Sequence, residues 1–89
     1  MIPSLQFTRE RRIRDVLQHA AGAFEVDPLR IVIRSYFESP ERLGGRIEAI
    51  AVLSLPDHPS HRAIHVSFLE WVRIGEEWMP IKTLAGPMQ

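Results

Sequence analysis

The sequence predicts an α+β fold in which one N-terminal helix packs on a four-stranded antiparallel meander, in the order α-β-β-β-β. Three observations lead to this prediction. Apolar residues recur every three or four positions in one early segment, which is typical of an amphipathic helix. Later segments alternate apolar and polar residues, as half-buried strands do. Stretches rich in glycine, proline and charged residues separate these segments and predict short connections.

The composition is that of one small domain spanning residues 1–89. A chain this short buries only about 60% of its extended surface, so its core is modest, which favours help from a partner subunit. The absence of cysteine excludes disulfides, thiol catalysis and cysteine-ligated metals. The chain has no apolar run of membrane-spanning length and no signal-peptide pattern, so we expect a cytoplasmic protein without a membrane partner. The formal net charge of zero argues against bulk attraction to nucleic acid.

The helix is predicted over residues 8–23. Thr8 is the expected N-cap because its hydroxyl can accept a hydrogen bond from a free first-turn amide, while Phe7 packs just outside the helix. Gly22 weakens or caps the last turn, and Asp27-Pro28 prevents continuation because the residue before proline avoids the helical region. The predicted apolar stripe consists of Ile13, Val16, Leu17, Ala20, Ala21 and Phe24.

The first two strands are predicted over residues 29–38 and 46–55, joined by a loop rich in glycine and charge. On the second strand, the small side chains of Ala49 and Ala51 leave room for the helix that we expect to cross the sheet. The expected core side of the first strand carries Leu29, Ile31, Ile33, Ser35 and Phe37, and that of the second carries Ile47, Ala49, Ala51, Leu53 and Leu55.

The third strand is predicted over residues 62–74, the longest β-prone run in the chain. Gly75 suits the first central position of a type II′ turn into a last strand over residues 77–84. Pro80 marks that strand as an edge because proline donates no ladder hydrogen bond, and residues 85–89 are expected to be an unstructured tail. The more apolar side of the third strand is assigned to the core: Ile64, Val66, Phe68, Glu70, Val72 and Ile74.

A single helix covers only part of such a sheet, so one sheet face is left open to water or to a partner. We expect this face to be a protein interface, most simply between copies of the chain, because Tyr, Trp and Arg combine apolar area with a polar handle. The alternatives are an ordinary solvated face stabilised by cross-strand pairs and a surface that binds nucleic acid. The expected interface residues are Arg34, Tyr36, His65, Leu69, Trp71 and Arg73.

A cluster of arginines at the predicted helix start supports a second hypothesis, binding of nucleic acid or another phosphate anion. A helix N-terminus presents free amides that bind anions, and guanidinium groups add to its positive charge. Pairing of Arg11 with Asp15 one turn later would instead make the cluster a solvated structural face. The residues concerned are Arg9, Arg11, Arg12 and Arg14.

A third hypothesis is a small ligand-binding or catalytic cup between helix and sheet. Glu70, on the expected core side of the third strand, could act there as a general acid or base, unless a β-bulge turns it outward. Asp57, His58, His61 and His65 could ligate a metal, but their spacing matches no compact ligand motif. We therefore expect no metal, no cofactor and no catalytic residue, and favour a non-enzymatic interaction module.

Overall fold

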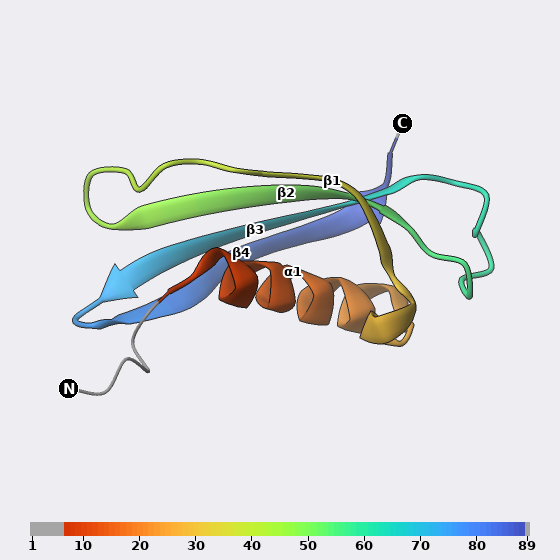
Figure 1. The fold of residues 1–89 in the computed structure, drawn as a ribbon, viewed down its shortest axis with the longest axis horizontal. Helices are drawn as coiled ribbons and strands as arrows, with labels where there is room; N and C mark the ends of the chain where they lie inside the picture. Colours follow the sequence, from red (N-terminus) through yellow and green to blue (C-terminus); the bar gives the residue numbers. More distant parts are fainter. Residues whose placement is uncertain (1–6, 89) are drawn as a thin grey trace.

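One helix lies along one face of a four-stranded antiparallel sheet, as Figure 1 shows. The computed structural model describes residues 7–88. The strands lie in the order β1-β2-β3-β4, each antiparallel to the next, which confirms the predicted α+β meander. The elements are α1 (Arg9–Phe24), the short 3-10 turn η2 (Pro28–Arg30), β1 (Val32–Glu38), β2 (Arg46–Ser54), β3 (His65–Ile74) and β4 (Glu77–Pro87).

The helix α1 begins at the predicted cap. Thr8 has an extended backbone, and its hydroxyl oxygen accepts a hydrogen bond from the Arg11 amide at 3.1 Å. The helix ends at Phe24, where Glu25 adopts a left-handed conformation with φ of 57° and its amide donates to the Ala21 carbonyl. The C-terminal cap is therefore Glu25 and not Gly22, and Asp27 then caps the turn η2 through the Leu29 amide.

Replacing Thr8 with alanine is expected to lower the free energy of unfolding by about 1 kcal/mol, because one first-turn amide loses its acceptor. Urea denaturation followed by helical circular dichroism measures this change. Thr8→Ser is the matched control, since it keeps the accepting oxygen and should unfold within a few tenths of a kcal/mol of the native chain. Equal stability of Thr8→Ala and the native chain would contradict the cap assignment.

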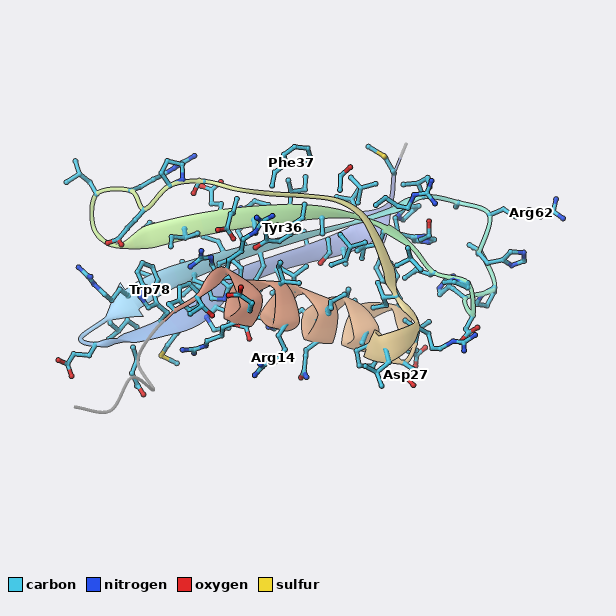
Figure 2. The ribbon with its side chains drawn as sticks, in the orientation of Figure 1. Arg14, Asp27, Tyr36, Phe37, Arg62 and Trp78 are labelled. Atoms are coloured by element: carbon cyan, nitrogen blue, oxygen red, sulfur yellow. The ribbon has the colours of Figure 1, made fainter. Side chains whose placement is uncertain are left out.

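The strand β1 starts three residues later than predicted and contains a β-bulge. Pro28–Arg30 forms the turn η2, so the extended backbone begins only after it. Ile33 pairs with Leu53 and Ser35 pairs with Val52, which leaves Arg34 as an extra residue in β1. The bulge reverses the alternation, because Tyr36 now faces the helix and Phe37 faces away from it (Figure 2).

The strand β4 is an edge strand, as Pro80 predicted, but it is longer than expected. Ala85, Gly86 and Pro87 pair with Ser67, Val66 and His65, so the residues expected to form a tail extend the sheet to Pro87. Backbone pairing with the long neighbour β3 outweighs the weak strand propensity of this segment. The β3–β4 connection is the expected two-residue turn, with a positive φ of 66° at Gly75.

The core lies between α1 and the sheet. The helix contributes Val16, Ala20 and Ala21 and packs against β2, β3 and β4. Ala49 and Ala51 are 2% and 0% exposed, which confirms that the small side chains of β2 lie beneath the helix. No helix among residues 7–88 is long and apolar enough to cross a membrane.

The predicted orientation of β3 is wrong. Its helix-facing side is not the more apolar side that includes Phe68, but the side that includes Trp71, which is fully buried. The strand register determines this orientation, because the correctly predicted core residues Ile47 and Ala49 of β2 lie directly opposite Trp71 and Leu69. The buried side of β3 carries His65, Ser67, Leu69 and Trp71.

Candidate functional site

The sheet surface that faces away from α1, called the open face below, carries a row of large apolar side chains across every strand. Phe37 pairs with Ile50, Ile50 with Phe68, and Phe68 with Leu84. Phe37, Ile50 and Leu84 are 63%, 40% and 61% exposed, so the row presents its apolar surface to solvent. Figure 2 shows Phe37 projecting away from the helix. These four residues are called the bulky row.

A second row of smaller side chains runs beside the bulky row. Ser35 pairs with Val52, Val52 with Val66, and Val66 with Gly86, so this small row also crosses every strand. Because Gly86 has no side chain, the edge of the sheet is hollowed there. The hollow is lined by Val66, Phe68, Leu84, Ala85, Gly86 and Pro87.

The charged residues of the open face lie on the other side of the bulky row and are paired within the chain. Arg46 lies 3.3 Å from Glu70, and Arg42 lies 3.0 Å from Glu48. Lys82 is the cross-strand neighbour of Glu70. These ion pairs leave the open face close to electrical neutrality, with an apolar half and a charged half.

No protein-family model, curated protein or solved structure matches this chain. The candidate site is therefore defined by the geometry of the chain's own residues.

Four of the six predicted interface residues do not lie on the open face, which corrects the sequence-based assignment. His65, Leu69 and Trp71 are 2%, 0% and 0% exposed beneath α1. Tyr36 also faces the helix, where its hydroxyl donates to Glu38 Oε2 at 2.5 Å. The cause is the reversed orientation of β3 and the β-bulge in β1.

The two remaining predicted interface residues are exposed but lie away from the bulky row. Arg34 is the extra residue of the bulge in β1. Arg73 lies near the end of β3, where its guanidinium stands 3.7 Å from the Glu41 carboxylate and over the Trp78 ring. The predicted core side of β2 is confirmed, so Ile50 and Val52, which alternate with it, lie on the open face. Phe37 and Phe68, which were predicted to lie in the core, are also on the open face.

Trp71 is an anchor of the core. Its indole Nε1 donates to Asp15 Oδ2 at 3.0 Å, and the Phe7 ring meets it edge-on with centroids 5.2 Å apart. Asp15 therefore binds Trp71, and the expected helical pair with Arg11 is not formed. Phe7 also stacks on Trp78 at 4.9 Å, so the segment before the helix closes one end of the core.

The arginines at the start of α1 mostly hold the helix to the sheet. Arg12 donates to both Glu38 carboxylate oxygens, at 2.8 and 2.6 Å, and to the Phe7 carbonyl. Arg11 donates to the Trp78 carbonyl, and Arg9 lies over the Tyr36 ring. Only Arg14 of the four points to solvent without such a contact among residues 7–88. These engagements weaken the case for an anion site at the helix start.

Arg12 and Glu38 each stabilise the charged form of the other. Hydrogen bonds from Arg12 lower the pKa of Glu38, and the same bonds raise the pKa of Arg12. Burial raises the pKa of Tyr36, and its hydrogen bond to the Glu38 carboxylate adds to this rise. All three groups keep their ordinary charges near neutral pH, which makes this cluster a structural clamp between α1 and β1.

Most of the other predicted polar residues contact neighbouring side chains. Glu70 lies on the open face beside Arg46, so it faces away from the helix, and the third hypothesis of a cup with Glu70 between helix and sheet is wrong. His58 and His65 pack their rings against Phe24, while Asp57 pairs with Arg30. Across residues 7–88, no group of three His, Asp or Glu side chains is placed to hold a metal ion.

Proposed function

We propose that this chain is a non-enzymatic interaction module that binds a partner protein through the open face of its sheet. The observation that carries the proposal is the bulky row, in which large apolar side chains cross the whole sheet on its uncovered side. Contiguous apolar surface of this kind marks interaction sites, whereas single exposed apolar residues do not.

The composition of the central strands supports an interface over a solvated surface. An antiparallel sheet with one wet face alternates apolar and polar residues. In β2, however, the outward residues Ile50 and Val52 alternate with inward residues that are also apolar. β3 likewise carries Val66, Phe68 and Val72 on its outward side. Apolar residues at these outward positions suit a sheet covered on both faces.

The charge distribution favours a protein over a nucleic acid as the partner. Binding to a phosphate backbone requires several guanidinium or ammonium groups free to replace counterions. On the open face, Arg42 and Arg46 are already paired with Glu48 and Glu70. Besides these pairs and Lys82, the open face carries the bulky row and the small row, whose largely apolar surface matches the core of protein interfaces.

Site-specific photo-crosslinking tests this proposal. A benzophenone amino acid replaces Phe37 or Phe68 in the chain produced at its native level in cells, and Gln18 on the exposed side of α1 is the control position. Crosslinked protein products are expected from both positions of the bulky row and not from Gln18. Failure to obtain any product from Phe37 and Phe68, or equal products from Gln18, would overturn the proposed function.

A further inference from the structure

We propose that the partner of the open face is a second copy of this chain, packed face to face as a two-fold dimer. This inference rests on the proposed function, because it names the partner of the same surface. The shape, the charge and the area of the open face support it independently of one another.

The shape of the open face is complementary to itself. The side chains of the bulky row project farther from the sheet than those of the neighbouring small row, which has Ser35 and Gly86 at its ends. A two-fold axis perpendicular to the strands and between these rows places each bulky row over the small row of the other copy. Leu84 then enters the hollow at Gly86 of the partner subunit. Sheets packed in sandwiches interdigitate their side chains in this way.

The charges of the open face are compatible with a copy of itself. In the proposed arrangement the row of Glu48, Glu70 and Lys82 flanks the two apolar rows and forms the rim of the contact. Glu48 and Glu70 keep their partners Arg42 and Arg46 there, so no charge is buried unpaired. A nearly neutral face offers no net charge that would select an acidic or basic foreign partner.

The area of the open face is sufficient for a dimer of moderate affinity. Strands about 4.8 Å apart that overlap over roughly eight residues give a four-stranded face of about 19 by 26 Å. With side-chain relief, two such faces bury on the order of 1,000 Å² in total, which lies near the lower limit for a specific interface. We therefore expect a dimer with a Kd in the micromolar range.

Sedimentation equilibrium of the purified chain between about 1 and 200 μM tests the dimer, a range that spans the expected Kd. The native chain should change from monomer to dimer across this range. Phe68→Asp and, independently, Leu84→Lys should raise the Kd at least about 30-fold, because the first places a charge on a central strand of the apolar contact and the second places one in the hollow at Gly86. Leu43→Asp is the matched control, since Leu43 is 100% exposed in the β1–β2 loop, and it should leave the Kd unchanged.

The outcomes separate this inference from the proposed function. A native chain that stays monomeric at 200 μM, or a dimer that both open-face variants leave intact, overturns the second copy as partner. Crosslinks from Phe37 and Phe68 to a different protein would in that case still uphold the proposed function. Circular dichroism verifies that each variant is folded, and Leu84→Lys, on the edge strand, serves if Phe68→Asp does not fold.

Introduced cysteines test the arrangement, because the chain has none of its own. Ile50→Cys mixed with Val52→Cys should form more mixed disulfide than Val52→Cys mixed with Val66→Cys, since the proposed axis brings residue 50 over residue 52 of the other copy. A two-fold axis parallel to the strands would instead bring Val52 over Val66 of the partner subunit. The reverse ranking would therefore overturn the proposed packing of rows.

Discussion

Replacing Trp71 with alanine is expected to lower the free energy of unfolding by about 3 to 5 kcal/mol, the largest effect of any single substitution proposed for this chain. The side chain is 0% exposed, contacts Phe7, and donates its indole hydrogen to Asp15. The substitution therefore leaves a cavity beneath the helix and removes the hydrogen bond of a partly buried carboxylate. A domain of this size has a total stability of roughly 5 to 10 kcal/mol, so the variant should be close to unfolding at room temperature.

Urea denaturation at about 1 μM protein measures this effect below the concentration at which we expect dimers. Phe37→Ala is the control, because Phe37 is also aromatic but is 63% exposed on the open face. Its loss should change the stability of the monomer by less than about 1 kcal/mol. Similar losses for the two variants would contradict the assignment of the buried and open faces.

Replacing Arg12 with alanine is expected to lower the free energy of unfolding by about 2 to 3 kcal/mol. The Arg12 and Glu38 side chains are only 14% and 19% exposed. Glu38 would therefore lose its two guanidinium hydrogen bonds at a site that is largely shielded from water. Adding Glu38→Gln to Arg12→Ala should recover part of the loss, because the neutral amide needs no counter-charge. A double-mutant cycle in urea at pH 7 measures the coupling.

The contribution of this pair should decrease in acid. Because the folded-state pKa of Glu38 lies below its ordinary value of 4.5, the contribution is complete above about pH 4.5 and is lost as the pH falls through the lowered value. The exposed pair of Arg30 and Asp57 is the control, with side chains 61% and 48% exposed. Arg30→Ala should cost no more than about 1 kcal/mol at any pH. An equal cost for Arg12→Ala would contradict the clamp.

The order and type of the elements could be predicted because each depends on a local pattern. The stripe of α1, the cap at Thr8, the inward residues of β2 and the edge position of β4 all follow from neighbouring residues and their spacing. The extension of β4 to Pro87 did not follow, because it depends on pairing with a distant strand. Local propensity is overridden where a long neighbour supplies the hydrogen bonds.

The candidate site was harder to predict because it depends on which side of each strand faces the helix. For β3, counting apolar residues favoured the side with Phe68, since the open face is itself apolar and the buried side includes His65 and Ser67. Only the register with β2, which places Ala51 opposite Ser67, decides between the sides. The small buried side chains make room for the helix, but the alternation of residues along β3 does not show which side the helix covers.

The extra residue at Arg34 makes β1 tolerant of a deletion at that position. Ile33 and Ser35 already pair with the adjacent residues Leu53 and Val52, so a chain without Arg34 would keep Tyr36 toward the helix and Phe37 on the open face. A loss of one codon there would thus preserve both the clamp and the bulky row. In an alignment with a chain of this fold that lacks the bulge, the one-residue gap therefore belongs at Arg34, because a gap placed after Phe37 would match core residues with surface residues.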